Sequence, residues 1–158
     1  MANKKKQRST AAVNRKAGFD IQVEQTYEAG LILTGDEIKS IRAGRVQLTG
    51  SYVKIMAGHR SGRQLPAVVV LGLHLGLAEQ PDRIRPLLLH GAEVRELERA
   101  LRVKGQTAVP LDLYLSHGWA KLKVGVGRGR KAYDKREVLK KRDIERDQRR
   151  DLKYVKRP

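Results

Sequence analysis

The chain of 158 residues contains no cysteine. Disulfide bonds, thiolate metal sites and cysteine nucleophiles are therefore excluded, and a reducing compartment is compatible with the sequence. The four histidines lie at positions 59, 74, 90 and 117, without the spacing or the acidic companions of metal ligands. No nucleophile, base and orienting group stand together in a recognisable pattern. We therefore expect no metal, no cofactor, no small-molecule substrate and no enzymatic activity.

Long hydrophobic runs are also missing. The longest, PAVVVLGLHLGLA at 66–78, is too short for a membrane span and is interrupted by glycines and a histidine. The amino terminus, MANKKKQRST, lacks the hydrophobic stretch of a secretory signal. Aromatic residues number only seven, which argues against base stacking across a broad surface. We expect a cytoplasmic protein without a membrane partner.

Charge is abundant and unevenly distributed, with a net charge of +17. Residues 1–16 include six basic and no acidic residues, residues 121–158 include sixteen basic against six acidic residues, and the stretch between is nearly neutral. This distribution predicts a folded domain with two ends that bind polyanions. The alternative is that the charge serves only solubility. We expect a disordered basic arm at 1–13, a folded domain at 14–132 and a basic tail at 133–158.

Alternating hydrophobic residues predict a mainly β domain. Strands are expected at 19–25, 28–33, 52–56, 66–73 and 86–89, followed by a hairpin of 109–115 and 121–126 around a turn at 116–118. Two short helices are inserted between the strands. One begins with a capping box of Thr34 and Glu37 and ends at Gly44, and the other covers 92–103. Short alternating strands with inserted helices favour a small closed barrel.

The tail has a different pattern. Residues 137 and 141, and residues 145 and 149, are acidic–basic pairs at helical spacing, but apolar residues are too sparse to pack on a core. We therefore expect the tail to be disordered alone and helical on a polyanionic surface. Asp134 and Glu137 are interpreted as the N-cap and the third residue of a capping box that starts this helix.

The segment GRGRKAYDKRE (127–137) joins the domain to the tail. It opens no helix directly after a strand and is followed by no GK[ST], so the pattern of a nucleotide-binding loop is absent. Glycine between arginines allows the backbone to approach phosphate closely. The single aromatic ring, Tyr133, suits stacking on one unpaired base. The alternative is that Tyr133 packs against the edge of the barrel.

Six fragments carry a resemblance to a known family: NRKA (14–17), YEAGLILTGDEIKSIRAGR (27–45), SYVKI (51–55), RPLLLH (85–90), VPLDLYL (109–115) and KVGVGRGRKAYDKRE (123–137). Together they resemble the SsrA-binding proteins, the SmpB family. The resemblance implies an oligonucleotide-binding-fold (OB-like) antiparallel barrel. It also implies binding to the tRNA-like domain of tmRNA and its delivery to stalled ribosomes for trans-translation, which rescues the ribosome and tags the unfinished peptide. The implied partners are tmRNA and small-subunit rRNA, and the bound protein is expected to be monomeric.

The resemblance implies contacts to tmRNA at Asn14, Glu28 and Leu88, and it implies that Leu88 is exposed. Glu28 either accepts hydrogen bonds from a base amino group or a 2′-hydroxyl, or orients a nearby basic side chain. Basic residues within or near these motifs complete the expected set: Arg15, Lys16, Lys39, Arg42, Arg45, Lys121, Lys123, Arg128, Arg130 and Lys131. The chain departs from the family pattern at Pro86, where a lysine is usual, and across 59–82.

For the tail, the resemblance implies a helix that enters the decoding centre and the empty message channel. Tyr133 is expected to stack near a decoding-centre base, and Lys135 and Arg136, next to Asp134, to contact ribosomal RNA. The expected channel contacts are Lys140, Lys141, Arg142, Arg146, Arg149 and Arg150. A tail that orders only in a vacant channel would sense a missing message. Composition alone also allows a constitutive ribosomal protein, and an RNA-processing enzyme is a further alternative.

Overall fold

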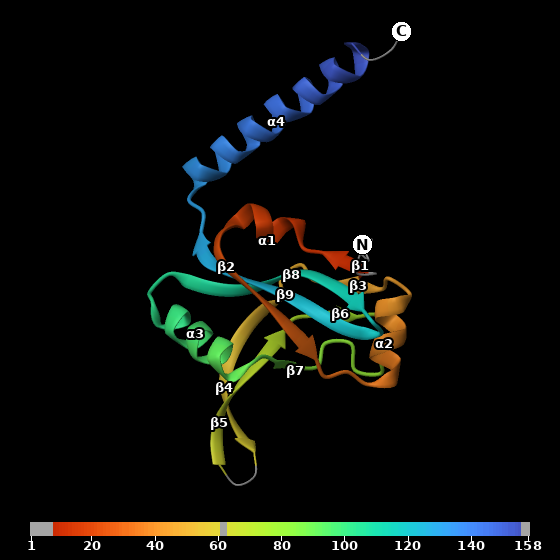
Figure 1. Ribbon diagram of the computed structural model, residues 1–158, viewed down its shortest axis with the longest axis vertical. Coiled ribbons are helices and arrows are strands. Elements are labelled where there is room, and N and C mark those ends of the chain that lie inside the picture. Colours follow the sequence, from red (N-terminus) through yellow and green to blue (C-terminus); the bar gives the residue numbers. More distant parts are fainter. Residues whose placement is uncertain (1–7, 61–62, 156–158) are drawn as a thin grey trace, which may run out of the picture.

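The computed structural model describes residues 8–60 and 63–155, so the first seven residues of the expected basic arm lie outside the described residues. Figure 1 shows the elements. In chain order they are β1 (Arg8–Val13), α1 (Arg15–Asp20), β2 (Ile21–Leu31), α2 (Gly35–Arg42), β3 (Val46–Gln47), β4 (Tyr52–Arg60), β5 (Arg63–Leu71), β6 (His74–Leu75), β7 (Arg85–Leu88), α3 (Gly91–Arg102), β8 (Gln106–Ser116), β9 (Trp119–Gly129) and α4 (Ala132–Val155).

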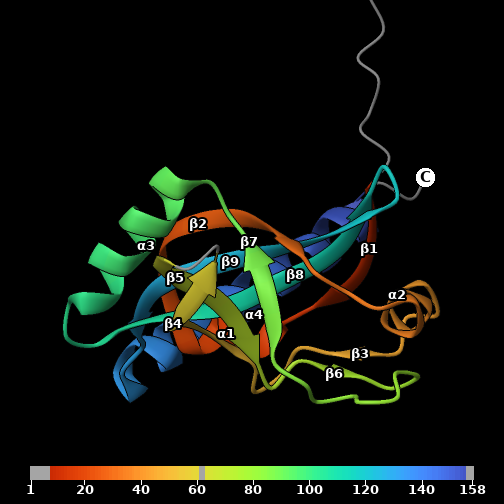
Figure 2. The same cartoon turned by 90° about the horizontal axis from the view of Figure 1, so that it is seen from below.

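Most of the strands belong to one closed sheet. Its order is β1-β8-β4-β5-β7-β2-β9, and β9 also pairs with β8. This last pairing closes the six strands from β8 to β9 into a ring, and β1 lies outside the ring along β8. Figure 2 shows the strands wrapped around one another, with α3 on one side and α2 on the other. The expected mainly β architecture with short helices is confirmed.

The β8–β9 hairpin supplies much of the core. Along β9, Leu122 and Val124 are fully buried, and the residues between them face outward because successive side chains in a strand alternate. From outside the ring, α3 contributes the fully buried Leu97. The hairpin turn contains His117 (φ 52°) and Gly118 (φ 81°), and two positive φ angles are what a type I′ turn requires. The predicted turn is confirmed.

Helix α2 also begins and ends as predicted. The Thr34 N–H donates to the Glu37 carboxylate at 2.8 Å, which satisfies an N–H that has no partner within the helix. Gly44 has a φ of 69° and donates to the Ile41 carbonyl at 3.1 Å, and the next N–H, of Arg45, donates to the Ser40 carbonyl at 3.0 Å. These two bonds form a Schellman motif, for which glycine is the preferred residue.

The amino-terminal region differs from the expectation of a disordered arm through residue 13, because residues 8–13 form β1. On this edge β8 bonds to β4 only between Ala108 and Val53, which leaves residues 112–116 of β8 without a partner there. β1 pairs along that stretch and covers the backbone groups that would otherwise face solvent. The sequence pattern of the arm alone could not show this open edge.

Two expected strands are joined into one. Residues 19 and 20 belong to α1, and β2 then runs without a break across residues 26 and 27, the gap between the strands expected at 19–25 and 28–33. Gly30 pairs with Leu88 of β7 on one side and with Lys121 of β9 on the other. It is therefore an interior strand residue between two neighbouring strands.

The tail is helical in the structure, as α4, whereas the sequence led us to expect disorder in the absence of a partner. Figure 1 shows α4 extending away from the barrel beside α1. The Lys131 N–H donates to the Asp134 carboxylate at 3.2 Å, so Asp134 is the third helical residue and not the predicted N-cap. The apolar Leu139 and Ile144 remain exposed, in keeping with a helix that lacks a core-facing stripe.

A buried ionic cluster joins α2 to the first residue of β7 and to the segment just before it. Glu37 and Arg85 are both buried, and Arg85 Nε donates to Glu37 Oε1 at 2.8 Å. Arg83 donates to the same carboxylate at 2.6 and 2.7 Å. Arg85 also donates to four backbone carbonyls, those of Leu73, Gln80, Pro81 and Arg83. Burial alone would raise the pKa of Glu37, but hydrogen bonds from Arg83 and the Thr34 N–H bring the pKa below its ordinary value.

Replacing Glu37 with glutamine keeps the shape of the side chain but leaves Arg85 buried without its counter-charge. We expect the free energy of unfolding, measured with urea at pH 7, to fall by about 3–5 kcal/mol. Asp36→Asn is the matched control, because Asp36 lies on the same helix and pairs with the exposed Lys39 at 3.1 Å. It should change stability by less than about 1 kcal/mol.

The pH dependence follows from the lowered pKa of Glu37. The stabilisation by its charge is present above the unfolded-state pKa, about 4.3, and is lost as the pH falls through the lower folded-state pKa. The stability difference between the unsubstituted protein and Glu37→Gln should therefore narrow as the pH falls below about 4. A difference that stays constant from pH 7 to pH 3 would contradict this role of Glu37.

Candidate nucleic-acid interface

The outer face of β2, β8 and β9 brings several of the predicted residues together. Glu28 pairs across the sheet with Lys123, and two residues further along β2, Gly30 pairs with Lys121. Because buried residues of β9 alternate with these lysines, both lysine side chains face outward. The ring thus places an acidic residue of β2 between two cations of β9.

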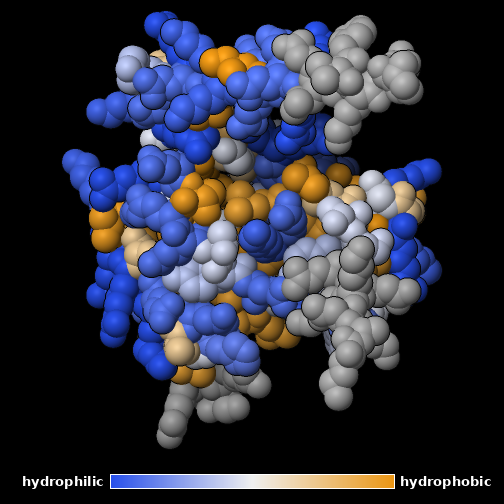
Figure 3. Space-filling view, turned by 45° about the horizontal axis from the view of Figure 1, so that its top comes forward, coloured by the Kyte–Doolittle hydropathy of each residue, from blue (hydrophilic) through white to orange (hydrophobic). Residues whose placement is uncertain are grey.

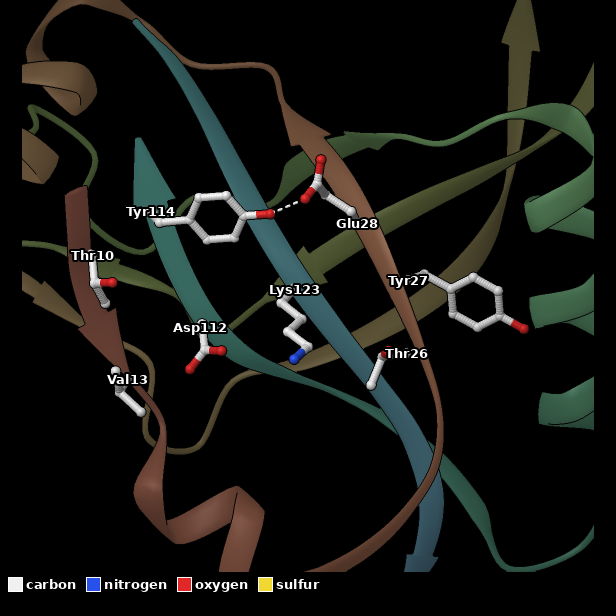
Figure 4. A pocket seen from close by; sticks show the side chains of 8 residues that line it. All are labelled: Thr10, Val13, Thr26, Tyr27, Glu28, Asp112, Tyr114 and Lys123. Atoms are coloured by element: carbon white, nitrogen blue, oxygen red, sulfur yellow. Dashed lines mark hydrogen bonds between the residues drawn. The ribbon is translucent and has the colours of Figure 1, made fainter. Parts of the chain in front are cut away.

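Glu28 is held by two side chains. The Tyr114 hydroxyl donates to one carboxylate oxygen, and the Lys121 ammonium group donates to the other. Figure 4 shows the Tyr114 ring lying across β9 with its hydroxyl directed at Glu28, whereas Tyr27 points away. Of the two roles considered for Glu28, this geometry fits the one in which the carboxylate orients a basic side chain.

A hollow lies in front of this group. Its volume is about 450 Å³, and residues of β1, β2, β8 and β9 line it: Thr10, Val13, Thr26, Tyr27, Glu28, Asp112, Tyr114 and Lys123. Tyr114 is absent from the site residues predicted from the sequence. The signal was present, because alternation along β8 places Tyr114 opposite to the buried Leu113 and therefore on the outer face. What the sequence could not show is that Tyr114 reaches Glu28, two strands away.

Leu88 lies at the surface, 57% exposed, while its neighbour Leu87 is buried. A second hollow of about 290 Å³ is lined by Leu88 together with Glu28, Gly30, Leu89, His90, Glu93 and Lys121. The predicted residues Glu28 and Leu88 therefore border one continuous region of surface, and an apolar group lies beside a carboxylate and an ammonium group.

Asn14 does not lie on this surface. Its side chain is only 4% exposed, its amide donates to the carbonyls of Leu48 (3.1 Å) and Pro110 (3.0 Å), and its oxygen accepts from the Ala17 N–H (3.0 Å). Asn14 is thus the N-cap of α1 and fixes this helix to the barrel. The predicted Arg15 and Lys16, on the first turn of α1, are exposed.

The GRGR segment has a structural role as well. A side chain at Gly127 would place its Cβ 1.9 Å from the Gln22 carbonyl oxygen of β2, so only glycine fits there. Arg130 donates to the carbonyls of Gly18 (3.1 Å) and Phe19 (3.0 Å) at the end of α1. Arg128 and Lys131 remain exposed. The glycine of this segment therefore allows the backbone of β9 to approach the backbone of β2 closely. This role is separate from the predicted approach to phosphate.

Three predicted cations belong to a different element. Lys39 and Arg42 lie on α2, Arg45 follows the end of this helix, and all three are exposed. Figure 2 shows α2 on the opposite side of the barrel from α3. The structure therefore groups these three with α2, apart from the outer face of β2, β8 and β9.

The predicted tail residues all lie on α4. Tyr133, in its first turn, is 68% exposed and does not pack against the barrel edge. Lys135 pairs with Asp20 of α1 at 2.8 Å, and its hydrogen bond lowers the pKa of Asp20. Arg142 lies over the Phe19 ring, 5.6 Å from its centroid. The other cations are exposed: Arg136, Lys140, Lys141, Arg146, Arg149 and Arg150. Figure 3 shows α4 as a mostly hydrophilic band.

Two properties of the described residues bear on other functions. Residues 8–60 and 63–155 contain no group of three or more His, Cys, Asp or Glu side chains placed to hold a metal ion. Within the same ranges, every helix is too short or too polar to cross a membrane.

Comparisons with known proteins agree with one another. The family described as "SmpB protein" matches residues 11–154. The "SsrA-binding protein" of Leuconostoc mesenteroides is 44% identical over 93% of this chain and 96% of its own length. That of Chloroflexus aggregans is 43% identical over 97% of both chains.

A solved structure, "tmRNA-SmpB: a journey to the center of the bacterial ribosome", contains a similar chain. It is 38% identical, with a TM-score of 0.61, and the match covers 77% of this chain and 85% of that chain. The family match spans both the barrel and most of α4, so it includes every element that carries a predicted RNA contact. The chain therefore belongs to the SmpB family.

Proposed function

We propose that the protein binds the tRNA-like domain of tmRNA and delivers tmRNA to stalled ribosomes for trans-translation. Family membership supports this function, as does the likeness to a chain described with tmRNA and the ribosome. The observation that carries the proposal is the arrangement around Glu28. Its carboxylate fixes Lys121 and the largely buried Tyr114 at the rim of a hollow on the outer face, where a folded RNA can approach.

In this proposal, the outer face of β2, β8 and β9 is the surface that recognises tmRNA. Lys121 and Lys123 contact phosphates, and the hollow bordered by Tyr114 accepts a ribose or a base edge. Glu28 keeps the Lys121 ammonium group in one place, so that the lysine loses little conformational freedom when RNA binds. Leu88 packs against an apolar face of the RNA next to this group.

Asn14 and Arg130 contribute indirectly. Both hold α1 against the barrel, and α1 carries the exposed Arg15 and Lys16. We assign to Asn14 and Arg130 the placement of α1, and to Arg15 and Lys16 the contact with RNA phosphates. The other exposed cations of the predicted set add sequence-independent attraction: Lys39, Arg42, Arg45, Arg128 and Lys131.

We assign separate tasks to the barrel and to the tail. The barrel, which we assign to the OB-like type, recognises tmRNA, and the tail contacts the ribosome. As a helix of 24 residues, α4 is about 36 Å long and carries exposed cations along its length. Tyr133 stacks in the decoding centre, Lys135 and Arg136 bind rRNA phosphates, and the remaining helix occupies the message channel when no message is present. The bound protein acts as a monomer in the cytoplasm, where ribosomes stall, and performs no chemistry itself.

Replacing Glu28 with alanine tests this recognition surface, because the two physical accounts of the carboxylate predict changes of opposite sign in the affinity for RNA. If Glu28 only repelled phosphates, its removal would strengthen RNA binding. If it orients Lys121 and Tyr114, its removal weakens binding, and we expect a loss of about tenfold or more in affinity for the tRNA-like domain. The measurement is a binding titration at physiological salt.

Glu24→Ala is the matched control for this experiment. Glu24 lies on the same strand and contacts Arg128 at 3.9 Å and Gln106 at 2.8 Å, away from the hollow. Its replacement should leave affinity within about twofold. Tighter binding by Glu28→Ala, or an equal effect of both replacements, would contradict the positioning role.

Replacing Tyr133, Lys135 and Arg136 with alanine should separate the two activities. We expect affinity for tmRNA to stay within about threefold, while peptide tagging on stalled ribosomes is abolished. Asp20→Asn is the control, because it breaks the ion pair with Lys135 but leaves the tail residues intact. Tagging should survive that change. If the triple variant lost tmRNA affinity and tagging together, the tail would be part of the surface that binds tmRNA, and the proposed separation would be wrong.

A further inference from the structure

Trp119 is the only tryptophan in the chain, and its side chain is 75% exposed. Among residues 9–58 and 65–150, no other large hydrophobic side chain is as exposed. An indole has a large apolar surface that is usually covered in a folded domain. Neither the predicted RNA contacts nor the tail explains why this side chain projects into solvent.

The β8–β9 hairpin holds Trp119 in a fixed position. Trp119 is the first residue of β9 and pairs with Ser116, directly after the turn of His117 and Gly118. Ser116 is buried, and its hydroxyl lies 3.1 Å from His117 Nδ1. A rigid backbone reduces the conformational entropy that an aromatic side chain loses on binding. The exposed ring is therefore suited to contact a partner.

Its place in the strand connects Trp119 with the proposed interface. Residues 119, 121 and 123 of β9 face the same side because side chains alternate, and the intervening Ala120 and Leu122 are buried. Each step of two residues advances about 7 Å. The indole of Trp119 thus lies at the end of a row of outward-facing side chains. This row continues through Lys121, the partner of Glu28, to Lys123.

We propose that Trp119 stacks on a single unpaired base of the RNA that binds this face, with Lys121 and Lys123 on the phosphates nearby. The inference rests on the proposed function and deepens it, because it adds a contact that distinguishes a folded RNA with an exposed base from a plain duplex. The cations along the same strand favour a nucleic acid over an apolar partner. Because the chain has only seven aromatic residues, we expect Trp119 to stack on one base and not on a series of bases.

The single tryptophan provides a direct measurement. The full chain is titrated with the tRNA-like domain of tmRNA, and the indole emission is recorded. A label on the RNA reports binding independently. Stacking predicts that indole emission is quenched with the same midpoint as the binding curve. An intact duplex without unpaired bases, at a concentration that saturates the basic surface, should leave most of the emission unchanged.

Substitutions then separate stacking from apolar contact and from charge. Trp119→Leu retains an apolar side chain without a ring, and should weaken binding by about 5- to 100-fold, whereas Trp119→Phe should lose less. The slope of log K against log salt should be unchanged in both variants, because neither removes a charge. Lys123→Ala should instead reduce that slope by about 0.7–0.9. Because Trp119 is exposed at a hairpin end, circular dichroism should show that both tryptophan variants fold.

The outcomes distinguish this inference from the proposed function. If the labelled RNA binds tightly but indole emission is unchanged and Trp119→Leu binds normally, the stacking inference is wrong and tmRNA binding stands. If emission responds only to ribosomal proteins and not to RNA, the inference is also wrong, and Trp119 contacts protein. If the unsubstituted chain does not bind the tRNA-like domain, the proposed function fails and the inference fails with it.

Discussion

The structure depends on the position of β9 between β2 and β8. By pairing with both strands, β9 closes the ring, and this closure determines which side of each strand faces the core. Leu122 and Val124 then point inward, and Lys121 and Lys123 point outward next to Glu28. A shift of one residue in this pairing would bury the lysines and expose Leu122 and Val124. The hydrophobic core and the proposed RNA-binding face are therefore fixed by the same register.

A second constraint is the separation of charge from the core. Apart from the buried Glu37–Arg85 cluster, which ties the start of β7 to α2, the described basic side chains lie mainly on the outer surface and on α4. This arrangement leaves α4 with few contacts to the barrel, chiefly Lys135 with Asp20 and Arg142 with Phe19. The protein thus combines a closed barrel, which we propose to recognise tmRNA, with a cationic helix whose surface is largely exposed.

Sequence patterns predicted the elements that local chemistry determines. The turn at 116–118, the end of α2 at Gly44 and the mainly β architecture were all predicted from short segments, whereas the turn type and the Schellman bonds come from the structure. The tail helix was expected only on a partner, because its apolar residues are sparse; in the structure Asp134 starts it and Lys135 attaches it to α1. That attachment joins residues more than one hundred positions apart, which no local pattern reports.

The candidate site was predicted in part for the same reason. Motifs indicated Glu28 and Leu88, and both lie on one surface. They also indicated Asn14, whose side chain is instead satisfied inside the protein by Leu48, Pro110 and Ala17. A motif shows that a residue type is required at a position. It does not distinguish a residue that contacts the RNA from one that places the contacting helix.

The most direct test of the central claim compares affinities for the tRNA-like domain of tmRNA and for an ordinary alanine tRNA, with and without residues 133–158. A barrel that reads tmRNA through its outer face predicts a strong preference for the tRNA-like domain, retained after the tail is removed. Equal and steeply salt-dependent binding to both RNAs, lost together with the tail, would contradict it. The protein would then be a non-specific polycation, and a constitutive place in the ribosome would explain its charge better.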